Sequence, residues 1–182
     1  TALPLRRELI EAVNEVYGYL LATVGNTGEM GTIINWEQHL FPSLLIEPGE
    51  KLAQALGGPL DGDAILPGDY SGEPRMFVPE VRASLTQGEA LTLRVTVLDR
   101  KPARQVTVYW RPLGSGEYAA VAARYVARGV WTITLPGEAT AADAFEYYVA
   151  GLTDGGQALH FPVGAPRMTQ SVVVAPPLKN VG

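Results

Sequence analysis

The chain has 182 residues, 47% of them hydrophobic and 18% charged, with a net charge of −5 and no cysteine. This composition is that of a folded protein and excludes a disordered chain, and the lack of cysteine excludes disulfides, thiolate metal ligands and cysteine nucleophiles. The sequence contains no apolar run near the roughly 20 residues that span a bilayer, and it encodes no dense basic face. We therefore expect neither a membrane span nor nucleic acid binding.

Charge is unevenly distributed along the chain. Residues 1–75 contain four Lys and Arg against eleven Asp and Glu, a net charge of −7, whereas residues 76–182 contain ten against eight, a net charge of +2. This difference predicts two units with separate surfaces. The first residue is Thr1 rather than Met, and we expect a piece of a longer or processed protein.

Three helices are predicted in residues 1–57. Apolar residues recur at three- and four-residue spacing over residues 4–24, with Leu9 in the inward stripe, and shorter patterns cover 32–41 and 48–56. We expect Pro42 to end the second helix. Because such short helices bury little apolar surface alone, residues 1–57 are predicted to form a helical connecting subdomain that packs on the sandwich, on a partner or, as we favour, on a catalytic domain N-terminal to it.

Residues 58–75 are rich in Gly, Pro and Asp and predict a linker or a draped loop. From residue 76 to 182, short alternating segments are separated by turn residues, as in a two-sheet β-sandwich. The predicted fold class is therefore mainly β: a seven-stranded immunoglobulin-like sandwich preceded by the small helical subdomain. The seven strands are expected at residues 78–85, 90–98, 104–111, 118–126, 130–135, 145–152 and, with an interruption, 157–174.

Five motifs in the sandwich region carry a family resemblance: LTLRVTV (91–97), VTVYWRP (106–112), GSGEY (114–118), VWTITLP (130–136) and FEYYVAG (145–151). In this order they resemble the immunoglobulin-like and fibronectin type III-like accessory domains of secreted bacterial glycoside hydrolases, over residues of about 76–175. The predicted strand that carries Trp110 departs from the type III pattern, because it is the third rather than the second. The resemblance implies a non-catalytic spacer or brace for a catalytic domain, occasionally a carbohydrate binder, in a secreted or periplasmic bacterial protein.

The segment Asn35–His39 is the densest polar cluster in the sequence. Trp36 offers a plane on which a sugar ring can stack, and Glu37 and His39 offer hydrogen-bonding groups. Glu29 and Glu37 would act as the acid and base of a glycosidase only if their carboxyl groups lay at a defined separation across a cleft. The alternative interpretation is a short helix in which Trp36 packs inward while Glu37 and His39 face water.

A second group of candidate contact residues lies on the outward positions of the predicted strands: Tyr109, Arg111, Tyr118 and Tyr148. Aromatic side chains aligned on one face form a carbohydrate platform or a contact surface for another domain. Ordinary cross-strand pairing is the alternative explanation for them.

We expect no metal site and no cofactor. His39 and His160 are the only histidines, and no metal-binding spacing accompanies them. Asp61, Asp63 and Asp69 offer oxygen ligands for calcium but lack the EF-hand order, so a solvated loop is favoured. The sequence also lacks the nucleophile-elbow, phosphate-loop and dinucleotide motifs, and we predict no catalytic residue.

Three functional hypotheses follow. The leading one is a non-catalytic C-terminal accessory region of a larger bacterial carbohydrate-active enzyme, which docks on the catalytic domain of the same protein and braces it. The second is a carbohydrate-binding module whose partner is a polysaccharide. The third is part of a glycosidase active site, contributed by Asn35–His39.

Overall fold

The computed structural model describes residues 2–25, 27–70 and 72–177; Thr1 lies outside these ranges. The chain divides into two compact units, Thr1–Gly72 and Glu73–Gly182. Helix and strand take about 34% and 31% of it. The chain as a whole is therefore mixed in secondary structure, and the prediction that it is mainly β is not confirmed.

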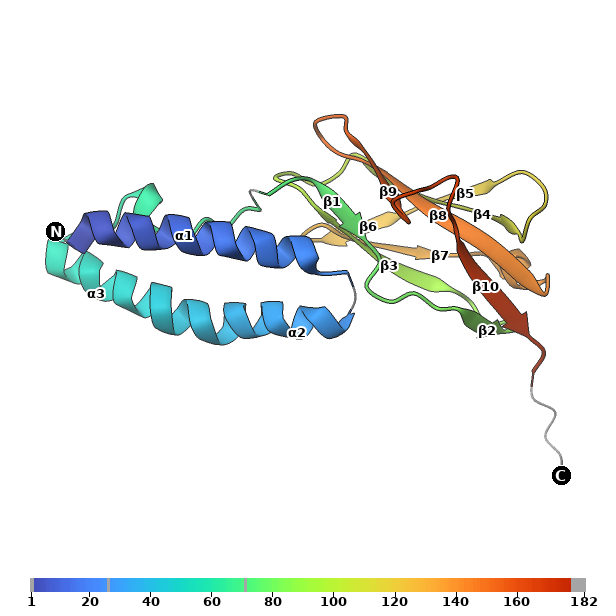
Figure 1. Ribbon diagram of the computed structural model, residues 1–182, viewed down its shortest axis with the longest axis horizontal. Coiled ribbons are helices and arrows are strands. Elements are labelled where there is room, and N and C mark those ends of the chain that lie inside the picture. Colours follow the sequence, from blue (N-terminus) through green and yellow to red (C-terminus); the bar gives the residue numbers. More distant parts are fainter. Residues whose placement is uncertain (1, 26, 71, 178–182) are drawn as a thin grey trace, which may run out of the picture. The chain divides into compact units, whose positions relative to one another are not determined.

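The first unit is a helical hairpin (Figure 1). Helix α1 (Ala2–Thr23) runs antiparallel to a second, unbroken helical stretch. That stretch consists of α2 (Thr27–Asn35), η1 (Trp36–Leu40), Phe41, η2 (Pro42–Ile46) and α3 (Glu47–Leu56). The chain then folds back, and the short helix η3 (Gly62–Ala64) contacts α1. The segment predicted as a linker or draped loop thus contributes to the hairpin.

The prediction that Pro42 ends a helix is wrong, because the turns around it are wider than α-helical turns. The N–H of Phe41 donates to the carbonyl of Trp36, and the N–H of Glu47 donates to that of Pro42, each five residues back. In an α-helix a proline ring crowds the carbonyl four residues earlier and leaves it without a donor. The π-type turns accommodate Pro42 and keep the stretch continuous.

The hairpin has a small core of its own. Ile10, Phe41 and Leu45 are buried, and Val13, Tyr17, Trp36 and Leu66 pack against them. A buried arginine ties this core to the returning chain: Arg6 donates from Nε to the Ala64 carbonyl at 3.0 Å and from Nη2 to the Leu45 carbonyl at 2.7 Å.

The second unit contains two β-sheets. Among the described residues, a four-stranded sheet has the order β1-β3-β7-β6, and a six-stranded sheet has the order β2-β10-β8-β4-β5, with β9 also paired to β8. The strands are β1 (Arg75–Phe77), β2 (Ser84–Thr86), β3 (Thr92–Leu98), β4 (Gln105–Pro112), β5 (Ala119–Ala122), β6 (Arg124–Ala127), β7 (Val130–Thr134), β8 (Ala144–Leu152), β9 (Ala158–Phe161) and β10 (Gln170–Ala175).

The described residues thus form ten strands, and the predicted number of seven is not confirmed. Two of the predicted strands are each divided into two. Residues 118–126 cover a place where the chain passes from one sheet to the other, so β5 and β6 belong to different sheets. In the second case, β9 and β10 flank the irregular segment between residues 162 and 169. The predicted strand at 78–85 contains only the first two residues of β2, and β1 lies before it.

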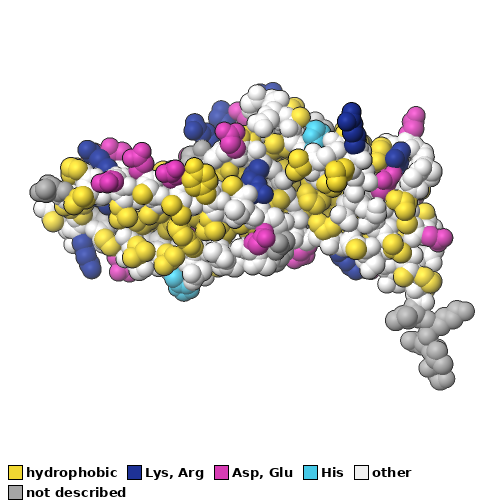
Figure 2. Space-filling view, in the orientation of Figure 1, with side chains coloured by type: hydrophobic (Ala, Val, Ile, Leu, Met, Phe, Trp, Pro, Cys, Tyr) yellow, Lys and Arg dark blue, Asp and Glu magenta, His cyan; other side chains and the backbone are white. Residues whose placement is uncertain are grey.

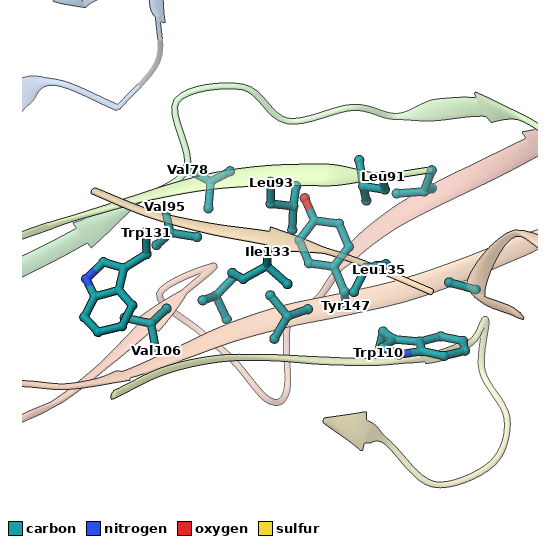
Figure 3. Packing of buried hydrophobic residues seen from close by; sticks show 14 of the residues in the cluster. Val78, Leu91, Leu93, Val95, Val106, Trp110, Trp131, Ile133, Leu135 and Tyr147 are labelled. Atoms are coloured by element: carbon teal, nitrogen blue, oxygen red, sulfur yellow. The ribbon is translucent and has the colours of Figure 1, made fainter. Parts of the chain in front are cut away.

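The two sheets share one hydrophobic core (Figure 3). Alternate residues of β3 and β7 point into it from one sheet, and alternate residues of β4 and β8 point into it from the other. Tyr147, Phe145, Val95, Val108 and Val149 are fully buried there. The packing uses one face of each sheet and leaves the other face of the six-stranded sheet outward.

Candidate functional site

The outward face of the six-stranded sheet brings together the four candidate residues that the sequence placed on predicted strands. In the register of β4 and β8, Tyr109 lies opposite Tyr148, and Arg111 lies opposite Glu146. On the other side of β4, Tyr109 lies opposite Ala120 of β5. Residues two apart on a strand share a face, so Tyr109, Arg111 and Tyr148 stand on the side away from the core, and Tyr118 directly precedes β5.

The aromatic rings of this face contact one another. Tyr109 and Tyr148 are stacked, with ring centroids 4.9 Å apart and an interplanar angle of 12°. Tyr118 meets Tyr148 edge to face at 5.1 Å, and the guanidinium carbon of Arg111 lies 4.3 Å from the Tyr118 centroid. We call Tyr109, Arg111, Tyr118 and Tyr148 the tyrosine–arginine cluster.

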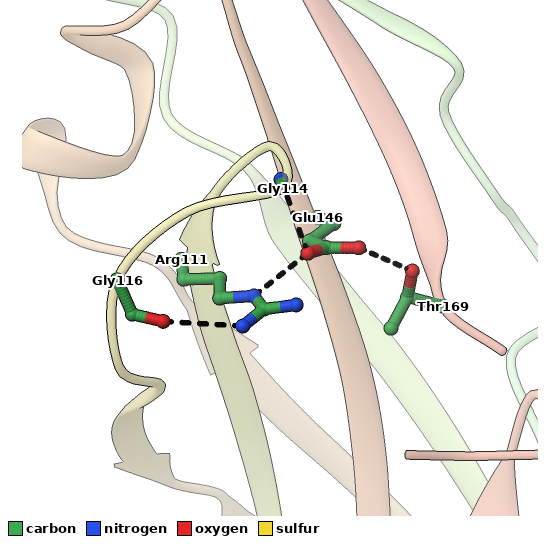
Figure 4. Close-up of polar contacts among 5 residues, drawn as sticks. All are labelled: Arg111, Gly114, Gly116, Glu146 and Thr169. Atoms are coloured by element: carbon green, nitrogen blue, oxygen red, sulfur yellow. Dashed lines mark hydrogen bonds and ion pairs between the residues drawn. The ribbon is translucent and has the colours of Figure 1, made fainter. Parts of the chain in front are cut away.

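Glu146, which the sequence analysis missed, holds this cluster in place (Figure 4). Its Oε1 accepts hydrogen bonds from Arg111 Nε at 2.7 Å and from the Gly114 N–H at 3.3 Å, and its Oε2 accepts one from Thr169 at 2.6 Å. Chiefly the Thr169 hydroxyl, and then Arg111 and Gly114, hold the pKa of this buried carboxyl below its ordinary value. A charged residue between the inward Phe145 and Tyr147 was the available sequence signal.

Together with Glu146, the tyrosine–arginine cluster carries no net charge at neutral pH. The Arg111 cation is paired with the Glu146 anion, and Arg111 also donates to the Gly116 carbonyl at 3.1 Å. Burial, followed by the neighbouring rings of Tyr109 and Tyr118, raises the pKa of Tyr148, which keeps its phenol protonated. The face therefore offers aromatic surface and neutral hydroxyls rather than a net charge.

The other three candidate residues lie in the helical hairpin. Trp36 is half-buried, with its ring 6.1 Å from that of Tyr17 and 5.9 Å from that of Phe41. Glu37 accepts a hydrogen bond from the Tyr17 hydroxyl, and burial together with this bond raises the pKa of Tyr17. The side chain of His39 is exposed.

Glu29 and Glu37, the carboxylates of the glycosidase hypothesis, have separate partners. The N–H of Gly25 donates to Glu29 Oε2 at 2.6 Å, while Glu37 binds the Tyr17 hydroxyl. These bonds place the first carboxylate at the start of α2 and the second beside α1.

The hairpin also has an outward apolar stripe that the sequence analysis did not separate from the buried one. Leu5, Leu9, Val16 and Tyr19 of α1 are 66%, 43%, 51% and 67% exposed. The expectation that Leu9 packs inward is therefore wrong. Hydrophobic side chains gather over the hairpin in the space-filling view (Figure 2). On the second helical stretch Ile34, Leu44, Ile46 and Leu56 are also exposed.

The described residues hold no group of three or more His, Asp and Glu side chains arranged to bind a metal ion. Asp61 and Asp63, considered above as calcium ligands, instead pair with Arg7 at 2.7 and 2.9 Å. Of the helices in the described ranges, none has the length and apolar character to cross a membrane.

No family model matches the sequence, and no curated protein is significantly similar to it. Among solved structures, an endo-β-1,4-mannanase from Thermotoga petrophila is similar at a TM-score of 0.42 and 12% identity, over 62% of this chain and 22% of the mannanase chain. A conjugative transposon lipoprotein from Bacteroides eggerthii is similar at a TM-score of 0.36 and 9% identity, over 56% of this chain and 98% of its own. At these TM-scores neither similarity bears on function.

Proposed function

We propose that this chain is a non-catalytic accessory region of a larger carbohydrate-active protein, and that its helical hairpin docks on another folded domain of the same protein and braces it. The observation that carries the docking role is the uncovered apolar stripe of α1. The carbohydrate context comes from the resemblance of the five sandwich motifs to accessory domains of secreted bacterial glycoside hydrolases.

Helix α1 has two neighbouring apolar stripes, and the hairpin covers only one of them. Ile10 is buried, and Val13 and Tyr17 pack beside it. The outward stripe, Leu5, Leu9, Ala12, Val16 and Tyr19, alternates four- and three-residue steps, which is the spacing of a helix–helix packing seam. Single exposed apolar residues are common, but a contiguous stripe indicates an interaction surface.

The charges beside the stripe indicate the kind of partner. Glu8 and Glu15 lie on the margin of the stripe, and the Tyr19 hydroxyl donates to Glu15 at 3.4 Å. A second copy of this chain would bring two segments of charge −7 together, which is unfavourable. The partner surface is therefore apolar with a margin of Lys or Arg, and we assign it to a neighbouring domain of the same polypeptide.

The strand order supports the accessory role of the sandwich. In an immunoglobulin-like domain the first, second, fifth and fourth strands form one sheet, and the third, sixth and seventh form the other. The same arrangement is obtained when the seven strands are taken, in chain order, as β1, β3, β4, β6, β7, β8 and β10. Trp110 then lies on the third strand and faces the core, as in immunoglobulin domains. This fold fits an exported bacterial accessory module.

The docking role is tested with the double variant Leu9→Gln, Val16→Gln. In the isolated chain these exposed side chains contribute little, so the free energy of unfolding should change by less than about 0.5 kcal/mol. In the protein expressed from the complete reading frame, the variant should lower the unfolding temperature of the combined structure, whereas Glu11→Gln should not. Equal behaviour of the two variants in that protein, or a reading frame that adds no folded domain, would overturn the proposal.

A further inference from the structure

We propose that the outward face of the six-stranded sheet binds a neutral oligosaccharide, with one sugar ring stacked on the side of Tyr109 that faces β5. This site lies on the sandwich and does not depend on the docking stripe of the hairpin. The sugar site can therefore be tested independently of the proposed docking function.

The Tyr109 side chain is partly exposed. One face of its ring is covered by the nearly parallel ring of Tyr148 on β8, 4.9 Å away. Because this stacking runs from strand to strand, the remaining face of Tyr109 looks toward β5. A pyranose presents an apolar C–H face of about the size of a phenol ring, and aromatic faces are suited to such contacts.

The neighbouring strand leaves room beside this ring. The residues of β5 on the same face are Ala120, opposite Tyr109, and Ala122, opposite Thr107. Their methyl groups are the smallest side chains that a strand carries apart from glycine. Strand β5 also ends its sheet, so a sugar on Tyr109 can continue into a longer chain past the sheet edge.

The chemistry of the surroundings favours a neutral sugar. Arg111 is already paired with Glu146, so it does not offer a free cation to a phosphate or uronate. The phenols of Tyr109, Tyr118 and Tyr148 each donate and accept a hydrogen bond, as does the exposed amide of Gln105. These groups match the mixed donor and acceptor pattern of sugar hydroxyls.

The outward face of the four-stranded sheet provides a comparison within the same domain. There Thr92 and Thr134 lie opposite each other with their hydroxyls 2.9 Å apart, and Arg94 lies opposite Thr132. That face follows the usual pattern of a solvated sheet surface. The concentration of tyrosines is thus a property of one face and not of the fold as a whole.

The test is calorimetric titration of the full chain with hexasaccharides of β-1,4-linked glucose, mannose and xylose and of α-1,4-linked glucose. At least one should bind saturably. Tyr109→Ala should weaken that affinity about tenfold, which corresponds to a lost aromatic contact of about 1.4 kcal/mol. Ala120→Leu, which fills the space beside the ring, should weaken it similarly. The matched controls on β6, Tyr125→Ala and Ala127→Leu, should leave it unchanged.

Several results would overturn the proposal. These are the absence of saturable binding to every hexasaccharide, equal losses for the Tyr109 and Tyr125 variants, or tighter binding of polygalacturonate than of any neutral sugar. Binding of a decaproline peptide in competition with the sugar would mean that the face is a peptide groove instead. If circular dichroism shows that Tyr109→Ala does not fold, the sugar affinities of Ala120→Leu and Ala127→Leu are compared instead. Both variants enlarge a side chain at an exposed position, so only a weaker affinity of Ala120→Leu supports the proposed site.

Discussion

Arg111 and Glu146 face each other across β4 and β8, with 2.7 Å between Nε and Oε1. The Glu146 side chain is 10% exposed and that of Arg111 is 28% exposed, so most of this pair is shielded from water. Through the same carboxylate, Thr169 and the turn at Gly114 are attached to β8. The pair therefore stabilises the sheet beneath the tyrosine–arginine cluster.

Removing this carboxylate should destabilise the sandwich. We expect Glu146→Ala to lower the free energy of unfolding by about 2–3 kcal/mol, because three donors lose a charged acceptor. Thr169→Val removes one of the three bonds and should cost about 1 kcal/mol. Urea titration followed by tryptophan fluorescence measures both. The exposed Glu117→Ala is the control, and a loss as large as that of Glu146→Ala would contradict this account.

The stabilisation by Glu146 should depend on pH. Its neighbours hold the folded-state pKa of the Glu146 carboxyl below the ordinary value of 4.5. The stabilisation is therefore fully present when the pH is above about 4.5. It is lost as the pH falls through the lower, folded-state pKa. The difference in unfolding free energy between the native protein and Glu146→Gln should therefore shrink between pH 6 and pH 3. A difference that stays constant over this range would contradict the shifted pKa.

Sequence patterns predicted the parts of the fold that depend on local alternation. Leu91, Leu93, Val95 and Val97 alternate with polar residues and are all buried, because period-two burial is encoded within one strand. The partner of Glu146 was not predictable in this way. Arg111 is 35 residues away, and only the register of β4 with β8 brings the two together.

In the helical hairpin, too, contacts between residues distant in sequence could not be predicted from local patterns. The apolar residues of α1 form two stripes, and its sequence does not show which of the two the hairpin covers. Leu9 was therefore assigned to the buried stripe, although it lies in the exposed one. Pro42 was expected to end a helix because isolated helices rarely contain proline. The π-type turns that accommodate Pro42 belong to a helical stretch that is stabilised by packing of Phe41 and Leu45 on Ile10. This tertiary packing cannot be predicted from a local sequence pattern.

Two glycines of the hairpin should respond in opposite ways to alanine. A Cβ at Gly49 would lie 2.8 Å from Arg6 Nη2, which is bonded to Leu45, so Gly49→Ala should displace the guanidinium and cost about 1–2 kcal/mol. At Gly31 nothing lies within 4 Å, and Gly31→Ala should stabilise the helix by up to about 1 kcal/mol. Thermal unfolding followed by circular dichroism at 222 nm distinguishes them; a stabilising Gly49→Ala would show that Arg6 is not held in place.

A second glycine pair tests the packing of β3 against the turn before β7. Gly129 has a φ of 77°, and a Cβ there would clash with the Val97 carbonyl oxygen. Gly129→Ala should therefore cost about 3 kcal/mol or more, since both the backbone angle and the contact are violated. Gly88 also has a positive φ but open space around it, and Gly88→Ala should cost about 1 kcal/mol. Urea titrations of the two variants compare the costs, and similar values would contradict the close contact at Gly129.

The docking of α1 on a neighbouring domain is tested most directly by thiol labelling, because the chain contains no cysteine. Val16→Cys places a thiol in the outward stripe, and Glu11→Cys places one on the polar side of the same helix. In the isolated chain both should react rapidly with a maleimide. In the protein expressed from the complete reading frame, labelling at position 16 should slow by at least about tenfold, corresponding to protection of about 1.4 kcal/mol, while labelling at position 11 stays fast. Equal and rapid labelling at both positions in that protein would contradict the docking of this helix.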